Sequence, residues 1–526
     1  MKTRLAALLV AVLLLLPVGC QGLEDWLYEK ESAPGGALPS PTAAPTLPTS
    51  PPRNGLFGVP WSGLSTVAPL VNDNRFDAQW LPLVYEGLFA LDEQFQPQPA
   101  LCTRYTTADN RVFLFTLRSG VLFHDGAPLT AEDAAWSLNA AKASPLYAAR
   151  LADMVSARAA DEMTLEVTLA RADPRLPALL TTPIVPALSA AGGGPVPGTG
   201  PYRPVTDAEF PHLAAQDAWW GTAKPLIERL ELVPAASGDK LIYAFETRAL
   251  SLAVYNPSDP TGVNFRGDYE TWPYDTPILE FVGFNTARKP LDDPLLRQAL
   301  AAAVDRDTAA KTEGRGVAAV LPIPTVSPLY NASLAGAYGF DLSRASTLLR
   351  GLGYEDHDSD GLLDLQSGWR LYPLTLNLLV CGDNTLHLEA ARRIADTMAG
   401  IGVDIQLTPL PLTAFRQALA KGAFDLYYGQ VTLAPNFAPT LFFAGGALGY
   451  GGYKDPETLA LWGEAAAALS GSEAQTAFWR RFLEEAPIAP VLFERQSLLT
   501  QRGLVVKPGP TWDNLFFNLA QWGPED

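Results

Sequence analysis

The residues with the clearest spacing for chemistry form an acidic turn between Asp356 and Gly361. It reads Asp356-His-Asp358-Ser-Asp360-Gly361, with acids at alternate positions and glycine sixth. Calcium loops use this spacing because alternate carboxylates converge on a hard cation while the glycine permits a sharp turn. Ser367 stands where such a loop supplies a bidentate glutamate, and no helical pattern follows. The favoured interpretation is a solvated hairpin turn with no metal site assigned, and calcium binding stays open as the alternative.

Signatures of common enzyme classes are absent from the sequence. It contains no His-Glu-x-x-His zinc motif, no Cys-x-x-Cys pair, no Gly-x-x-x-x-Gly-Lys-Ser/Thr phosphate loop and no Gly-x-Ser-x-Gly nucleophile elbow. The chain has only 4 histidines to serve as general bases. These observations predict a protein that performs no catalysis and carries no cofactor.

The longest patterned segment runs from Arg111 to Ala141. The continuous apolar run from Val112 to Leu117 predicts a strand that is buried on both faces. His124-Asp125-Gly126 predicts a turn in which the glycine adopts a positive φ. Thr130 and Asp133 have the spacing of a capping box, which predicts the start of an apolar helix.

This segment resembles the signature of the extracytoplasmic solute-binding proteins, family 5, which serve peptide/nickel-type ABC importers. The family signature is an aromatic-rich strand, Leu-Arg, a Phe-His-Asp-Gly turn and Thr-Ala-Glu-Asp at a helix start. Further matches follow in chain order and are Tyr85-Glu86-Gly87-Leu88, Gly198-Thr-Gly-Pro-Tyr202, Phe284-Asn285 and the Arg-Gln-Ala-Leu helix that starts at Asp293-Pro294. The resemblance covers nearly the whole chain after about Gly55.

The resemblance implies an α/β, two-lobed periplasmic-binding-protein-like (type II) fold with mixed sheets and a hinged cleft between the lobes. It assigns residues 55–277 plus 488–526 to lobe one and residues 278–487 to lobe two. Within lobe two, strand and helix patterns alternate from Leu374 to Tyr427. This alternation is typical of βαβ units and predicts a largely parallel sheet.

The resemblance also implies which residues line the cleft, where periplasmic binding proteins enclose a ligand by hinge closure. The expected ligand-binding residues lie at strand ends and crossings and are Trp61, Tyr85, Phe284, Asn285, Cys381, Asn384, Gln430 and Asn436. Peptide-binding relatives commonly carry an aspartate just after the strand that contains Tyr428, where it pairs with the free amino group of the peptide. Residues 429–439 contain no acid. The sequence therefore disfavours a standard free-amine peptide, because its buried ammonium group would lack a partner.

The first residues have the pattern of a lipoprotein signal. Lys2 and Arg4 lie beside an apolar run, Leu5 to Leu16, that is too short to span a bilayer comfortably. A small residue precedes Cys20, as at lipoprotein cleavage sites. This pattern predicts residues 1–19 as a signal peptide and Cys20 as lipidated; an ordinary secretory signal with an unmodified cysteine is the alternative.

Residues 33–52 are rich in Pro, Ala, Ser and Thr and have no core-forming pattern. Residues 20–54 are therefore expected to form an extended tether between the anchor and the folded part. The predicted location is the cell membrane, with the protein lipid-anchored on the extracytoplasmic face.

The charge balance excludes nucleic acid as a partner. The chain has 38 Lys and Arg residues against 56 Asp and Glu residues, for a formal net charge of −18. Nucleic-acid binding requires a basic surface that neutralises phosphates.

Together these features and the resemblance imply a substrate-binding lipoprotein of an ABC importer. It is expected to be a monomer that captures a peptide or peptide-like small solute and delivers it to permease subunits in the membrane. One alternative in the same fold is a sensor or scavenging binder of a non-peptide solute, such as a metal chelate or a glycan. An exported hydrolase and a structural surface protein are the alternatives from other classes.

Overall fold

The computed structural model describes residues 57–519 and Trp522, apart from residues 64–67, 188–195, 206–209, 222–224, 226, 236, 260–263, 469–470 and 506–507. The predicted signal peptide, Cys20 and the tether lie outside the described residues. None of the helices within them has the length and apolar character needed to cross a bilayer.

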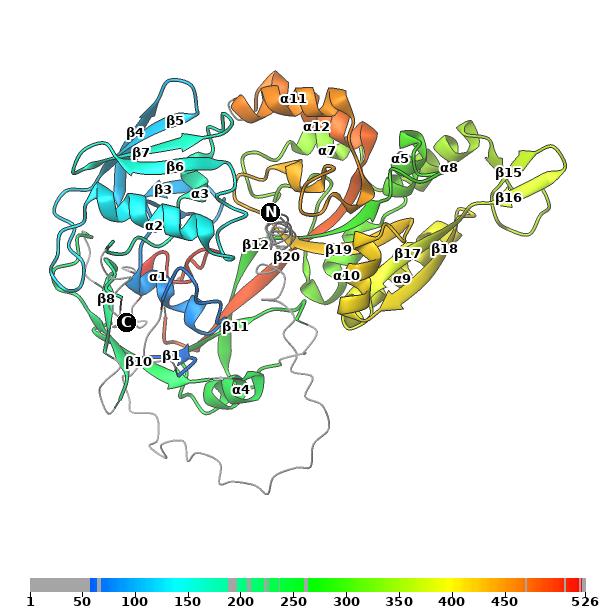
Figure 1. Cartoon of the computed structure of the whole chain (residues 1–526). Helices are drawn as coiled ribbons and strands as arrows, with labels where there is room; N and C mark the ends of the chain where they lie inside the picture. The colour runs from blue at the N-terminus through cyan, green and yellow to red at the C-terminus, as the bar shows by residue number, and fades with distance from the viewer. Residues whose placement is uncertain are drawn as a thin grey trace, which may run out of the picture.

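Two α/β lobes lie side by side and are joined by two long strands (Figure 1). The crossing strands are β12 (Tyr269–Phe284) and β20 (Ile488–Gln501), which pair antiparallel along most of their length. Their register shifts between Asp275 and Leu279 and again between Glu280 and Phe281. The crossing strands therefore carry the chain between the lobes, as the resemblance implies.

The first four-stranded sheet of lobe one is antiparallel and is covered by helix α2 (Ala131–Ala143) (Figure 1). Its strands in spatial order are β4 (Cys102–Thr107), β5 (Val112–Leu117), β7 (Thr164–Leu169) and β6 (Met154–Ala159). In β5, Phe113 and Phe115 are buried, but Val112 and Leu114 are each 38% exposed. The prediction that this strand is buried on both faces is wrong, because an antiparallel sheet leaves one face to solvent here.

The local signals around α2 are confirmed. The Thr130 side chain accepts a hydrogen bond from the backbone N–H of Asp133, and the Asp133 carboxylate accepts the backbone N–H of Thr130 at 2.9 Å. Gly126 adopts φ +88° in the turn before the helix. The capping box satisfies backbone groups that the first turn of a helix leaves unpaired.

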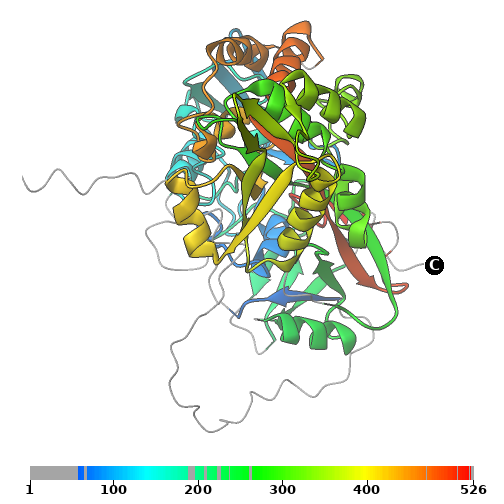
Figure 2. The ribbon, with the colours of Figure 1, turned by 90° about the vertical axis from the view of Figure 1, so that its right-hand side faces the viewer.

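The second four-stranded sheet of lobe one lies below the first in Figure 1. Its strands in spatial order are β1 (Phe57–Trp61), β10 (Arg229–Pro234), β9 (His212–Ala215) and β8 (Tyr202–Val205). Helix α4 (Gly238–Glu246, green) lies beneath β1 (blue) in Figures 1 and 2. The remaining elements are short and are η2 (Asp77–Gln79), α1 (Leu81–Val84), α3 (Leu176–Leu179) and the hairpin of β2 (Phe89–Leu91) and β3 (Pro97–Pro99).

A seven-stranded mixed sheet runs through the crossing strands into lobe two. Its order is β11 (Leu252–Tyr255), β20, β12, β19 (Leu426–Thr432), β17 (Thr375–Cys381) and β18 (Asp404–Leu410), and β13 (Gly316–Ala318) pairs with β20. Strand β17 is parallel to both β18 and β19, as predicted for βαβ units. The other pairings are antiparallel. The prediction of a largely parallel sheet is therefore wrong for the sheet as a whole, because the crossing strands form its other half.

The helices of lobe two flank this sheet (Figure 1). They are α5 (Pro294–Ala302), α6 (Arg306–Lys311), α7 (Ala332–Gly336), α8 (Leu342–Gly351), α9 (Thr385–Ala399), α10 (Leu412–Ala420), α11 (Pro456–Ala467) and α12 (Glu473–Glu485), with 3₁₀ turns η4 (Thr312–Gly314), η5 (Pro439–Phe442) and η6 (Gly449–Gly451). Asp293 caps α5, the helix predicted to start there, and Asp341 caps α8 in the same way, because each side chain accepts a backbone N–H of the first turn. A small sheet of β14 (Tyr354–Glu355), β15 (Asp364–Ser367) and β16 (Arg370–Pro373) projects from the outer end of this lobe.

Separate hydrophobic cores lie on either side of the crossing. Tyr274 and Leu498 belong to the core that fills lobe one. Val282 and Leu492, further along the same two strands, belong to a core within lobe two. A further core combines lobe-two residues with Phe95 of the β2–β3 turn. The lobes therefore touch through apolar side chains, while the residue-by-residue division at 277/278 and 487/488 stays a prediction.

Candidate ligand-binding site between the lobes

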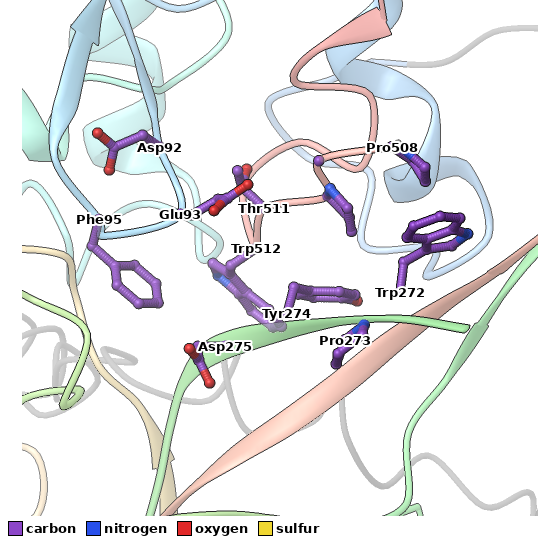
Figure 3. Close-up of a pocket in the computed structure, with 12 residues that line it drawn as sticks. Asp92, Glu93, Phe95, Trp272, Pro273, Tyr274, Asp275, Pro508, Thr511 and Trp512 are labelled. Carbon is purple, nitrogen blue, oxygen red and sulfur yellow. The ribbon is translucent and has the colours of Figure 1, made fainter. Parts of the chain in front are cut away.

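A cavity of about 170 Å³ lies beside the crossing strand β12 (Figure 3). Three segments far apart in the sequence line it. They are Asp92, Glu93 and Phe95 of the β2–β3 turn, residues 272–275 of β12, and residues 508–512 near the C-terminal end. Trp512 packs against both the core of lobe one and the core that spans the lobes. The cavity therefore borders the junction of the two lobes, where binding pockets preferentially form.

The β2–β3 turn holds the first group of lining residues in place. One carboxylate oxygen of Asp92 accepts the backbone N–H groups of Gln94 and Gln96 at 2.9 and 2.8 Å. This turn places Phe95 at φ +60° and directs its ring against Phe437 of lobe two, with ring centroids 5.7 Å apart. The lining of the cavity is thus fixed to both lobes at this point.

The aromatic residues of β12 are oriented by hydrogen bonds to β20. Trp272 donates from Nε1 to Oγ1 of Thr500 at 2.9 Å. Tyr274 donates from its hydroxyl to Oε1 of Gln496 at 2.8 Å. Because their polar atoms are satisfied by the neighbouring strand, these side chains offer ring surface to the cavity (Figure 3).

Of the residues that the structure describes, the charged ones that line the cavity are all acidic: Asp92, Glu93 and Asp275. Asp275 pairs with Arg495 at 2.7 Å, so its charge is largely compensated. Glu93 is exposed, and its carboxylate has no hydrogen-bond or ion-pair partner within the described part of the chain. The site therefore favours a cationic group next to aromatic surface. Its volume lies below the roughly 300–1,000 Å³ of drug-sized pockets, so it suits a small solute or one end of a larger one.

None of the eight residues expected to bind ligand lines this cavity. Trp61 and Tyr85 are buried in the core of lobe one, and Phe284 is buried in a core of lobe two. The Tyr85 hydroxyl donates to the carbonyl of Val196 at 2.9 Å, and burial raises the pKa of this phenol. The structure places these aromatic side chains where they stabilise the lobes.

The three asparagines among the expected ligand-binding residues make hydrogen bonds within the protein. Asn285 donates from Nδ2 to the carbonyls of Gly422 and Phe424 at 3.2 and 2.9 Å. The Asn384 side-chain oxygen accepts backbone N–H groups in the first turn of α9, where Asn384 is the N-cap. Asn436 donates from Nδ2 to Oδ2 of Asp173 at 2.9 Å.

The last two of the expected ligand-binding residues, Cys381 and Gln430, belong to lobe two. Cys381 is a buried free thiol at the end of β17, and burial raises its pKa. Gln430 donates from Nε2 to the buried carboxylate of Glu494. Gln430 thereby joins a buried polar group that the sequence did not reveal.

This group, here termed the Glu280 cluster, consists of Glu280, Arg315, His387, Tyr428, Gln430 and Glu494. Arg315 forms an ion pair with Glu280, and the Tyr428 hydroxyl donates to the other Glu280 oxygen. His387 Nε2 lies 3.9 Å from Glu280. Three of its buried polar atoms, Arg315 Nε, His387 Nε2 and Glu494 Oε2, have no hydrogen-bond partner in the described residues.

Burial sets the protonation states in the Glu280 cluster. Desolvation and the negative charge of Glu280 raise the pKa of Glu494 to about 8, so this carboxyl is protonated at neutral pH. Desolvation lowers the pKa of His387 to about 4, so its ring is neutral. The cluster therefore holds one compensated ion pair among neutral polar groups.

The Glu280 cluster and the cavity are neighbours along the crossing strands. Glu494 precedes Arg495, the partner of Asp275 at the cavity. Glu280 lies beyond the register shift that follows Asp275. Asp275 of the cavity and Glu280 of the cluster therefore lie at opposite ends of one irregular stretch of β12.

The residues that line the cavity are not among those predicted from the sequence. One signal was present, because Trp272-Pro-Tyr-Asp275 combines aromatic and acidic residues just before the expected crossing into lobe two. The β2–β3 turn and residues 508–512 carry no pattern that would bring them to the same place.

Three comparisons with known proteins agree with this architecture. The model of the bacterial extracellular solute-binding proteins, family 5, matches residues 96–448. The glutathione-binding protein GsiB of Salmonella paratyphi A is 24% identical over 313 residues, which cover 56% of this chain and 60% of that protein. The chain thus matches about three fifths of the length of this curated relative.

Solved structures show the same two-lobed fold over most of the chain. The ABC transporter substrate-binding protein CtaP of Listeria monocytogenes has a TM-score of 0.72 at 19% identity, covering 90% of this chain and 99% of that one. NikA of Brucella suis, solved in complex with Fe(III)-EDTA, has a TM-score of 0.67 at 20% identity, covering 89% and 99%. With a family model that matches more than half of its residues, the chain belongs to the bacterial extracellular solute-binding proteins of family 5.

Proposed function

We propose that this protein is the substrate-binding component of an ABC importer and that it captures a peptide-like small solute with a cationic group. The observation that supports the proposal is the cavity beside β12, which is lined by three acids and aromatic rings and has no basic residue among the described residues that line it. The protein performs no chemistry on the solute. It is a lipid-anchored monomer, held through Cys20, that delivers the solute to permease subunits.

The lining explains the preference for a cation. An ammonium group that leaves water must gain a carboxylate partner, and charge-assisted hydrogen bonds provide this compensation. Glu93 is exposed at the cavity and available for that role. Residues 429–439 lack the acid with which peptide-binding relatives commonly pair the free amino group of the peptide. In this proposal the acids that line the cavity take that role. Amine-bearing peptides are therefore included in the proposed ligand class.

A thermal-shift screen of the full chain in mild detergent tests the ligand class. Short free-amine peptides are compared with the same peptides N-acetylated, with metal chelates and with sugars. A ligand that binds only the folded state stabilises it by RT ln(1 + [L]/Kd), so the melting temperature rises with concentration. We expect a rise with free-amine peptides that N-acetylation reduces.

Two matched variants locate the site. Glu93→Gln should weaken the rise with free-amine peptides, because the cavity loses its available carboxylate. Glu162→Gln, which changes an exposed acid in the turn between β6 and β7, should behave as wild type. A rise only with acetylated peptides or non-peptide solutes would contradict the cationic ligand and favour the sensor or scavenger alternative.

The importer role needs a second measurement. The importer role predicts permease and ATPase genes beside this gene, and in vesicles that contain their products the loaded protein should stimulate ATP hydrolysis and solute uptake. Mass spectrometry should recover the solute unchanged. Recovery of a cleaved product would contradict the binding-only role.

A further inference from the structure

The acidic turn lies at the outer end of lobe two, away from the interlobe cavity. It connects β14 to β15 in the small sheet that projects from the lobe (Figure 1). The hairpin interpretation is confirmed, since Glu355 and Asp364 pair across the turn. Its acidic side chains take no part in the proposed function.

Three carboxylates of this turn converge on one point. Asp356, Asp358 and Asp364 each offer one oxygen, and these oxygens all lie within 4.8 Å of one another. At the largest of these spacings the three oxygens lie about 2.8 Å from their common centre, so a small inward movement brings all three within the 2.3–2.6 Å at which oxygen binds calcium. No Lys or Arg forms an ion pair with these acids in the described part of the chain. Within the described residues, the three negative charges therefore have no Lys or Arg as an ion-pair partner.

Asp364 gives independent evidence of a missing ligand. Asp364 is buried, with 3% of its surface exposed, whereas Asp356 and Asp358 are exposed. Its Oδ2 atom has no hydrogen-bond partner among the described residues. A buried carboxylate oxygen without a partner is costly, because it has lost water and gained nothing. A cation bound beside Asp356 and Asp358 would remove this penalty.

The turn is also held in place by its neighbours. Asp364 is fixed within β15, opposite Glu355 on one side and Pro373 on the other. The backbone N–H of Leu363, the preceding residue, donates to the carbonyl of Gly402 at 2.7 Å. The buried carboxylate therefore sits on a rigid element, while the two exposed acids leave the ion a path from solvent.

We propose that Asp356, Asp358 and Asp364 bind a calcium ion that links the two ends of the β14–β15 turn. Three carboxylates supply hard oxygen ligands, which suit calcium and do not suit zinc or copper, whose sites are built from histidine and cysteine. Calcium accepts 6–8 oxygens in flexible geometry, and water or backbone carbonyls complete its shell. Magnesium demands a near-ideal octahedron at shorter distances and fits an open loop less well.

Isothermal titration of the full chain with calcium chloride tests the site directly. The protein is first treated with EDTA, exchanged into calcium-free buffer with physiological salt, and then titrated. We expect one saturable calcium ion per chain and a melting temperature that rises with calcium. Asp358→Asn, which changes an exposed residue, should abolish the saturable binding without unfolding the protein. Asp364→Asn should abolish it as well.

Asp396→Asn is the matched control, because Asp396 is an exposed acid on α9 and lies outside the converging group. This variant should bind calcium as wild type does. Absence of saturable binding up to about 10 mM, beyond the weakest extracellular calcium modules, would overturn the proposal. Wild-type binding by Asp358→Asn, or equally tight binding of magnesium, would overturn it too.

Discussion

Asn436 donates a hydrogen bond from Nδ2 to Oδ2 of Asp173 at 2.9 Å, and the two residues are separated by 263 positions in the chain. Both side chains are buried. Asp173 also pairs with Arg175, whose guanidinium lies over the ring of Trp462 at 5.3 Å. Asp173 precedes α3 and Asn436 follows β19, so this small network links the two predicted lobes at a point near the Phe95–Phe437 ring contact.

Asn436→Asp should open this contact. The change replaces the donor with a second carboxylate against Asp173, and like charges at this distance repel. We expect a larger radius of gyration by small-angle X-ray scattering. Asn331→Asp is the control, because Asn331 caps α7 and aspartate caps a helix equally well. An unchanged radius of gyration for Asn436→Asp would show that the hydrogen bond does not hold the lobes together.

Glu280→Gln should destabilise the protein strongly. The change leaves the Arg315 guanidinium buried without its negative partner, and breaking a buried pair in this way costs about 3–5 kcal/mol. Urea denaturation measures the loss in the free energy of unfolding. Asp268→Asn breaks the exposed pair with Arg502 and should lower the free energy of unfolding far less, because water screens this pair. Equal losses in the two variants would contradict a tightly paired Glu280.

Local structure could be predicted from the sequence wherever neighbouring residues determine it. The caps at Thr130 and Asp293 depend on a side chain and the backbone a few residues away, and both are confirmed. The burial of β5 depends on whether another layer covers its second face. Val112 and Leu114 have the residue types of a covered strand, but no layer covers them. The sequence of one strand carries no information about that layer.

The candidate site was less predictable for the same reason. Its lining comes from the β2–β3 turn, β12 and residues 508–512, and only the fold brings these segments together. The expected residues lie at strand ends, as binding residues often do. In this chain, Asn384 and Asn285 satisfy backbone groups at those ends instead. Residue type and strand position therefore identified residues that make structural hydrogen bonds, and their contact with a ligand stays a prediction.

Gly198→Ala should disrupt the contact between the Gly-Thr-Gly-Pro-Tyr segment and α1. A Cβ atom at Gly198 would lie 1.9 Å from the carbonyl oxygen of Val84, a backbone atom that cannot move away cheaply. Overpacking of this kind costs about 1–3 kcal/mol or more. Gly336→Ala is the control, because a Cβ atom there meets nothing within 4 Å. A thermal melt should show a lower midpoint for Gly198→Ala alone, and equal midpoints would contradict the close approach.

Glu494→Gln should flatten the dependence of stability on pH above neutrality. Burial and the charge of Glu280 raise the pKa of Glu494 from its ordinary 4.5 to about 8 in the folded protein. Between these values the folded state keeps a proton that the unfolded state has released. The free energy of unfolding therefore falls as pH rises, by about 1.4 kcal/mol per pH unit, until the folded pKa is passed. Glutamine cannot ionise, so the variant lacks this loss.

The window from pH 7 to pH 8 separates this effect from those of His387 and Glu86. The lowered pKa of His387, about 4, reduces stability only as pH falls below the ordinary histidine value of 6.5. Burial raises the pKa of Glu86 to about 7, so Glu86→Gln should flatten the curve only below that pH. Urea denaturation at several pH values measures the free energy of unfolding. From pH 7 to pH 8 this free energy should fall for wild type and for Glu86→Gln. It should stay constant for Glu494→Gln. Parallel slopes for all three proteins would mean that Glu494 is already ionised in the folded state.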